Sequence, residues 1–274
     1  MYPFRYERPQ DLAEAVRLLR VHAQARPLSG GMTLLPTLKH RLARPSHLVD
    51  LARLDGLHGI ACQGGVLSVG AATPHAQVAA SPVVRQAIPA LAHLAGLIGD
   101  AQVRQRGTLG GSIANNDPAA DYPSAVLGLG ATVVTDRRRI AADDFFTGMF
   151  STALEAGEIV TAVEFPLPLR AAYCKHRHPA SGYALVGLFL AETSAGVRVA
   201  LTGAAPCVLR WTEAEARLSS RPADPLAAIQ QLQLAPEGLN DDLAATPAYR
   251  AHLAGVLLRR ALGQLSASPT AIKD

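Results

Sequence analysis

The sequence is short of cysteine, of charge and of long apolar runs. Only three of its 274 residues are cysteines, and Cys62, Cys174 and Cys207 lie far apart. They supply neither a disulfide framework nor enough thiolates for an iron–sulfur cluster. No stretch reaches about 18 consecutive apolar residues, and the first seven residues do not begin a secretion signal. These absences predict a chain with no transmembrane segment and no cluster of its own, located in the reducing cytoplasm.

Charge is sparse and scattered. Charged residues make up 18% of the chain, and the formal net charge is +4. The densest basic run, Arg137–Arg139, has no aromatic side chains interleaved with it, unlike a surface that stacks bases. It reads as a solvated turn between strands, and no nucleic-acid partner is expected.

Several catalytic motifs are missing. The chain has no G-x-x-x-x-G-K-[ST] segment, and the G-x-G at 128–130 is followed by Val133 where a dinucleotide fingerprint needs glycine. The segment Gly110–Ala114 ends in alanine, so it only weakly resembles the G-x-S-x-G elbow of serine hydrolases. His176 and His178 would share one face of a strand, but without further ligands they favour two surface side chains over a metal site. We therefore assign no catalytic residue and no metal ligand.

The order of apolar and turn residues predicts an α+β chain in three regions, 1–55, 56–168 and 169–274. The prolines at 166 and 168 end an alternating strand and mark the second boundary. Beyond them we expect a three-stranded antiparallel meander followed by helices. The expected strands are 171–174, 183–190 and 197–201, and the expected helices are 212–218 and 248–265.

Two glycine-bearing segments remain after these exclusions. One is Ser29–Pro36, where a helix would begin directly after Gly30-Gly31, and the other is Arg106–Asp121, which contains Thr108-Leu109-Gly110-Gly111-Ser112. Paired glycines allow backbone N–H groups to approach a ligand without an intervening Cβ atom. Successive N–H groups bind anions, and a helix N-terminus adds to that attraction. If the two turns converge they could hold a diphosphate, whereas either turn alone is better explained as a tight turn that needs glycine.

In residue identity and order, these segments resemble the medium, FAD-binding subunit of molybdenum hydroxylases of the carbon monoxide dehydrogenase and xanthine dehydrogenase type. The resemblance extends to about residue 203 and weakens afterwards. It rests on Pro3–Tyr6, Gly30–Pro36, Arg41–Asp50, Ile98–Gly111, Asp117–Asp121, Phe145-Phe146, Gly157–Val160 and Tyr173–Lys175. It implies a two-subdomain FAD-binding fold of the vanillyl-alcohol-oxidase/PCMH type, with 1–55 and 56–168 as subdomains and 169–274 as a C-terminal domain.

The resemblance also implies which residues contact FAD. The two glycine segments would cradle the diphosphate, Asp121 would hydrogen-bond the cofactor, and Lys175 would lie near the isoalloxazine. Ile98 and either Ile159 or Val160 match apolar contact positions. The implied cofactor-binding residues are Ser29, Gly30, Gly31, Met32, Thr33, Leu34, Ile98, Thr108, Leu109, Gly110, Gly111, Ser112, Asp121, Ile159, Val160 and Lys175.

The implied function is electron transfer by FAD within a larger complex. A large molybdopterin subunit would hydroxylate the substrate, and a small 2Fe-2S subunit would deliver the electrons. The three chains would form a heterotrimer that can dimerise. Two alternatives stay open: a flavin-free scaffold subunit of such a complex, and a stand-alone FAD-dependent oxidase. The substrate and the terminal electron acceptor do not follow from this chain.

Overall fold

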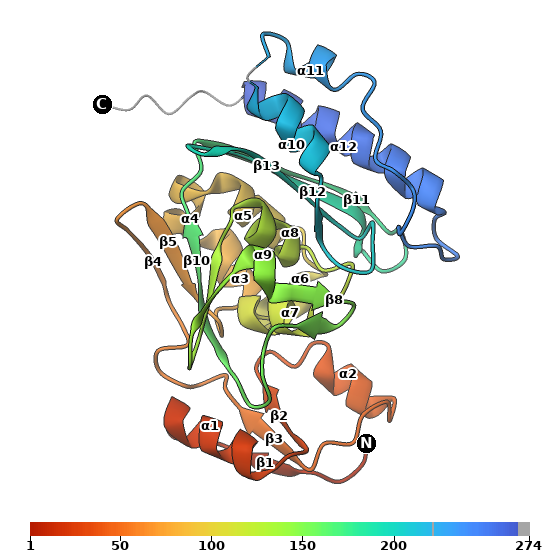
Figure 1. Cartoon of the computed structure of the whole chain (residues 1–274). Coiled ribbons are helices and arrows are strands. Elements are labelled where there is room, and N and C mark those ends of the chain that lie inside the picture. The colour runs from red at the N-terminus through yellow and green to blue at the C-terminus, as the bar shows by residue number, and fades with distance from the viewer. Residues whose placement is uncertain (221, 268–274) are drawn as a thin grey trace.

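The computed structural model describes residues 1–220 and 222–267, and it has a mixed α+β architecture, as expected (Figure 1). A small N-terminal unit lies at one end, and a C-terminal sheet covered by helices lies at the other. Between them lies a five-stranded sheet flanked by short helices. Among the described residues, no helix is both long enough and apolar enough to cross a membrane.

The N-terminal unit is a parallel three-stranded sheet in the order β1-β3-β2. Its elements are β1 Arg5–Glu7, α1 Leu12–Val21, β2 Ala25–Leu28, α2 Leu34–Lys39 and β3 His47–Asp50. Helix α1 begins with a variant of the capping box, in which the glutamate at N3 accepts from the residue before the N-cap. The Asp11 side chain accepts from the backbone N–H of Glu14 at 2.7 Å, and the Glu14 carboxylate accepts from the N–H of Gln10 at 2.8 Å. The chain leaves β2 directly into the first glycine segment, so this sheet fixes where that segment begins.

The central unit is an antiparallel sheet in the order β4-β5-β10-β6-β7. Its strands are β4 Ile60–Gln63, β5 Val66–Gly70, β6 Thr132–Thr135, β7 Arg139–Ala141 and β10 Val160–Pro166. Gly64 and Gly65 both have positive φ, 58° and 77°, as a two-residue hairpin turn requires, so the expected hairpin is present. Seven helices of the described chain and the β8–β9 hairpin complete the unit. They are α3 His75–Ala80, α4 Pro82–Ala87, α5 Pro89–Gly96, α6 Ala101–Arg106, α7 Leu109–Asn115, α8 Tyr122–Gly128, α9 Ala142–Phe145, β8 Phe146–Gly148 and β9 Ser151–Thr152.

The C-terminal unit contains the expected antiparallel meander with one additional strand. Its elements are β11 Arg170–Arg177, β12 Ala184–Thr193, β13 Gly196–Thr202, β14 Leu209–Arg210, α10 Thr212–Ser219, α11 Pro225–Ala228 and α12 Pro247–Ala267. The sheet therefore has four strands rather than three. Strand β14 is two residues long and pairs only through Ala200↔Arg210 and Leu201↔Leu209, so it is too short to produce an alternating pattern in the sequence.

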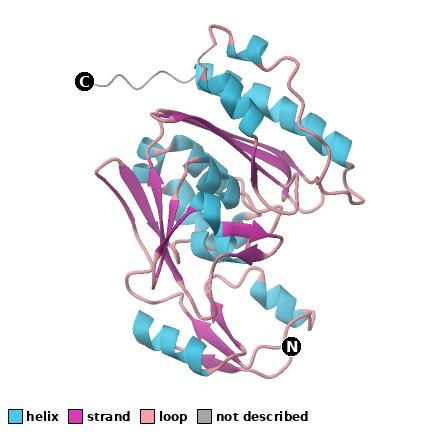
Figure 2. Cartoon of the chain, in the orientation of Figure 1, coloured by secondary structure: helices cyan, strands magenta, loops and turns pink. Residues whose placement is uncertain are grey.

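Both faces of the C-terminal sheet are buried. Strand β12 reads Ala-Leu-Val-Gly-Leu-Phe-Leu-Ala, and all eight of these residues are buried. Phe189 packs into the central core with α5 and α8, whereas Leu188 and Leu190 pack into a second core with α10 and α12. Figure 2 shows this sheet lying between two layers of helices. A continuous apolar run is typical of a strand covered on both sides.

Candidate functional site

The first glycine segment connects β2 to α2 and presents free backbone donors. Gly31 has φ 74°, a conformation that favours glycine. Within the described chain, the N–H groups from Gly30 to Leu34 have no hydrogen-bond acceptor. Thr33 caps α2 without a side-chain hydrogen bond, so the Leu34 N–H stays available, whereas the Leu35 N–H donates to Gly31 O at 2.9 Å. The segment therefore offers a short series of donors with little side-chain cover.

The second glycine segment is built differently, because its first amides already have acceptors. Leu109 N–H donates to Thr73 O at 3.2 Å, and Gly110 N–H donates to Ala71 O at 2.8 Å. Gly111 N–H donates to the Thr108 hydroxyl at 3.2 Å, which makes Thr108 the N-cap of α7. The sequence suggested donors from both segments. In the structure this segment contributes mainly rigid backbone and hydroxyl groups, and the first segment holds the free donors.

The two segments meet, although they are 79 positions apart in the sequence. The Ser29 and Thr108 hydroxyl oxygens lie 3.0 Å apart. A Cβ atom on Gly30 would lie 2.0 Å from Arg106 O and 2.8 Å from Gly107 Cα, so only glycine fits there. The expected convergence of the two turns is therefore confirmed. Their meeting point is a cradle of main-chain atoms that any side chain on Gly30 would fill.

Asp121 and Lys175 form a buried ion pair that also includes Tyr173. Lys175 Nζ lies 2.9 Å from Asp121 Oδ1 and donates to Leu97 O at 3.3 Å. The side chains of Lys175 and Asp121 are 1% and 4% exposed. The Tyr173 hydroxyl donates to Asp121 Oδ1 at 2.5 Å. Sequence reasoning named Asp121 and Lys175 separately, and the structure brings them together.

Burial shifts the acid–base behaviour of all three groups. It raises the pKa of the Asp121 carboxyl, and the Lys175 charge opposes that shift. It lowers the pKa of the Lys175 ammonium, against the attraction of Asp121. It raises the pKa of the Tyr173 phenol well above its ordinary value, with the Asp121 charge as the next cause. The phenol therefore stays protonated and remains a hydrogen-bond donor.

The remaining candidate residues are placed less directly. Ile98 is half-buried against the central core, next to Leu97, whose carbonyl accepts from Lys175. Ile159 and Val160 are 3% and 7% exposed, and their side chains belong to the N-terminal and central cores. The structure thus gives two groups of candidates, the paired glycine segments and the Asp121–Lys175 pair. The contact of Ile159 and Val160 with the cofactor stays a prediction.

Sequence reasoning missed Tyr173 as a site residue. A glycine inside the apolar run of β12, Gly187, was the available signal, because glycine in a strand interior often marks a close approach by another group. A Cβ atom on Gly187 would lie 2.6 Å from the Tyr173 hydroxyl.

The competing chemistries find no support in the described residues. Ser112 lies inside α7 rather than at a strand-to-helix elbow. No group of three or more His, Cys, Asp or Glu side chains that could hold a metal ion occurs in the part of the chain that the structure describes.

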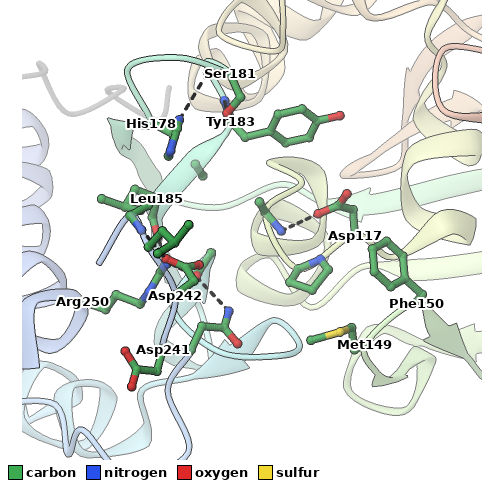
Figure 3. A pocket seen from close by; sticks show the side chains of 17 residues that line it. Asp117, Met149, Phe150, His178, Ser181, Tyr183, Leu185, Asp241, Asp242 and Arg250 are labelled. Carbon is green, nitrogen blue, oxygen red and sulfur yellow. Dashed lines mark hydrogen bonds and ion pairs between the residues drawn. The ribbon is translucent and has the colours of Figure 1, made fainter. Parts of the chain in front are cut away.

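A cavity of about 770 Å³ lies to one side of these groups (Figure 3). It is open to solvent and is lined by residues of the 117–119 segment, the tip of the β8–β9 hairpin, the β11–β12 connection and the 240–244 loop. Figure 3 shows Met149 and Phe150 on one side and Arg250 with Asp242 on the other. None of the candidate cofactor residues lines this cavity, so we keep it separate from the glycine cradle.

Comparison with known proteins agrees with this geometry. Residues 2–168 match the family described as FAD binding domain in molybdopterin dehydrogenase, and residues 172–265 match CO dehydrogenase flavoprotein C-terminal domain. The chain therefore belongs to the family of FAD-binding subunits of molybdopterin dehydrogenases. FAD is its cofactor, and it is an oxidoreductase subunit, as the sequence resemblance implied.

Individual relatives match over nearly their whole length. The carbon monoxide dehydrogenase medium chain of Hydrogenophaga pseudoflava is 34% identical, and the match covers 94% of this chain and 96% of that one. The solved carbon monoxide dehydrogenase of the same organism superposes with a TM-score of 0.87 over 97% of this chain and 99% of that chain, at 34% identity. Quinoline 2-oxidoreductase from Pseudomonas putida 86 superposes with a TM-score of 0.90 over 97% of this chain and 98% of that chain, at 32% identity.

Proposed function

We propose that this chain is the medium subunit of a cytoplasmic molybdenum hydroxylase and carries electrons through FAD held at the paired glycine segments. The observation that supports the placement is the contact of Gly30 with the backbone of Arg106 and Gly107, beside a series of free N–H groups. Backbone donors at such a junction suit a diphosphate, because they supply positive partial charge without long side chains.

The residues of this chain have binding and positioning roles in the proposal. The N–H groups from Gly30 to Leu34 donate to the diphosphate, and the Thr108 and Ser112 hydroxyls lie on the opposite segment. The buried Lys175 ammonium, held by Asp121, supplies fixed positive charge near the redox-active ring. Bound FAD supplies redox chemistry that accepts electrons singly and releases them in pairs. No residue of this chain is assigned as acid, base or nucleophile.

Substrate hydroxylation is proposed to occur on a large molybdopterin subunit, with a small 2Fe-2S subunit delivering electrons to this chain. Two relatives with almost equal identity to this chain are named for different substrates, carbon monoxide and quinoline. Similar medium chains thus occur with different substrates, which supports a partner chain as the site that selects them. The three chains would form a heterotrimer that can dimerise.

Replacement of Gly111 tests the placement of FAD. Gly111→Asp puts a carboxylate beside Thr108 on the second segment, where it would repel a diphosphate, and Gly111→Asn adds a side chain of almost the same size without the charge. We expect the assembled complex to lose most of its FAD with aspartate and to keep more of it with asparagine, as measured by released flavin per chain. Equal and full FAD content in both variants would show that the diphosphate lies elsewhere. A complex that is colourless in the wild type would instead support the flavin-free scaffold.

A further inference from the structure

The C-terminal sheet holds the segment that carries Asp121. Gly203 N–H donates to Pro118 O at 2.7 Å. The Thr202 hydroxyl lies 3.0 Å from Pro118 O and 2.6 Å from Ala120 O. Asp121 lies within the matched FAD-binding region, but these contacts come from the matched C-terminal region. The position of Asp121 therefore depends on the second region of the chain.

Tyr173 extends this support to the carboxylate itself. It is 1% exposed, and its hydroxyl donates to Asp121 Oδ1 at 2.5 Å. Lys175 is two residues further along β11, on the same face of the strand, and donates to Asp121 Oδ2 at 3.0 Å. The carboxylate is thus held from one strand by a neutral donor on Oδ1 and by a cationic donor that lies within 3.0 Å of both oxygens.

Gly187 makes room for the phenol. It pairs with Lys175 across β11 and β12. A Cβ atom at this position would lie 2.6 Å from the Tyr173 hydroxyl and 3.3 Å from its Cζ atom. Any larger residue at 187 would push the hydroxyl away from Asp121.

We propose that Tyr173 is a positioning residue of the flavin site: its hydroxyl, admitted by Gly187, fixes the Asp121 carboxylate and thereby the Lys175 ammonium. The inference rests on the proposed placement of FAD beside these groups. Packing alone does not explain the tyrosine, because phenylalanine would fill nearly the same volume. The hydroxyl is needed only if the carboxylate must stay ionised and oriented away from water.

The first test is Tyr173→Phe in the full chain, with Tyr249→Phe on the exposed side of α12 as the matched control. We expect FAD to bind about ten- to a hundredfold more weakly to Tyr173→Phe, because a buried carboxylate loses a hydrogen bond. FAD dissociation constants are measured by quenching of flavin fluorescence. The control is expected to bind FAD as the wild type does.

A second readout separates positioning from simple packing. The Tyr173 hydroxyl lowers the pKa of Asp121, so its loss lets the carboxyl take up a proton at higher pH. The acid-side loss of FAD affinity should therefore begin at higher pH in Tyr173→Phe than in the wild type. The other groups that face Asp121 stay in place in this variant: Lys175 and Arg177 on β11, Tyr122 on α8 and Tyr183 before β12.

A double-mutant cycle with Gly187→Ala tests the route through the phenol. We expect Gly187→Ala to weaken FAD binding in the wild-type background and to do so much less in the Tyr173→Phe background. The added methyl group also meets Thr202 Cγ2 at 2.8 Å, but that contact is present in both backgrounds and cancels in the cycle. An undiminished effect would mean that the methyl group acts through Thr202, against the assigned role of Gly187.

The outcomes for this inference and for the proposed function are distinct. A Tyr173→Phe chain with the wild-type dissociation constant and pH profile would overturn the positioning role and leave the FAD site intact. A wild-type chain that takes up no FAD would overturn both. A Tyr173→Phe chain that binds FAD weakly with a shifted pH profile, while Tyr249→Phe is unchanged, would support the inference.

Discussion

Adding one methyl group at Gly30 should separate the two glycine segments. In Gly30→Ala the new Cβ atom would lie 2.0 Å from Arg106 O and 2.6 Å from its carbonyl carbon. Both obstacles are backbone atoms, so no side chain can rotate away, and the segments must part by about 1 Å. Overpacking of this kind costs about 1–3 kcal/mol. If that strain distorts the junction of the two glycine segments, FAD should bind about five- to a hundredfold more weakly.

The measurement compares FAD dissociation constants and urea unfolding of the full chain for Gly30→Ala and Gly263→Ala. Gly263 lies in α12, and a Cβ atom there meets nothing within 4 Å. The control should therefore bind FAD normally and be slightly more stable, because alanine favours a helix interior over glycine. Folded Gly30→Ala protein that binds FAD with the wild-type constant would refute the placement of the diphosphate at this junction.

Three further predictions concern the ionisable groups Lys175, Arg138 and His75, each of which is itself buried or pairs with a buried carboxylate. Lys175→Met should lower the free energy of unfolding, measured by urea titration, by about 3–5 kcal/mol because Asp121 is left buried without its cation. The double variant Lys175→Met with Asp121→Leu should recover part of that loss. A single variant with the wild-type free energy of unfolding would contradict the buried pair. The Arg138 guanidinium lowers the pKa of Glu158 to about 2. The wild type should therefore exceed Arg138→Gln in free energy of unfolding by a constant amount above pH 4.5, and this difference should vanish as the pH falls toward 2. A difference that does not depend on pH would count against this ion pair. Burial lowers the pKa of His75 to about 4, so the unfolded chain binds the proton first and the free energy of unfolding of the wild type should fall between pH 6.5 and 4. His75→Gln should lack that part of the fall. Parallel curves of unfolding free energy against pH for the two proteins would show that His75 does not titrate in this range.

The glycine segments could be predicted from the sequence because the residues that identify them are neighbours in the chain. Gly30-Gly31 precedes a helix that starts at Leu34, as expected, whereas the helix that starts at Leu109 after Thr108 was not predicted. That the segments touch depends on tertiary structure, and only the resemblance to known flavoproteins placed them together. Their unequal supply of free N–H groups could not be predicted, because the acceptors for the second segment, Ala71 and Thr73, come from a different part of the chain.

The buried pair was harder to predict than the turns. A lysine is usually exposed, and nothing near Lys175 in the sequence indicates a carboxylate 54 positions away. Tyr173 was missed because its partner lies in another unit of the fold. Ile159 and Val160 were named from the resemblance alone, and their alternating, strand-like surroundings equally fit the buried core positions that they occupy.

The C-terminal sheet has packed helices on both faces and a central strand, β12, with eight consecutive buried residues, which has a practical consequence for handling this protein. The two regions that match separate families share one hydrophobic core, in which the ring of Phe189 packs against Gly128. An expression fragment that stops near residue 168 would expose the apolar surface of α5 and α8 to solvent. It would also leave Asp121 without Lys175. Such a fragment should precipitate rather than bind cofactor, so crystallographers and engineers should treat the whole polypeptide as the smallest workable unit.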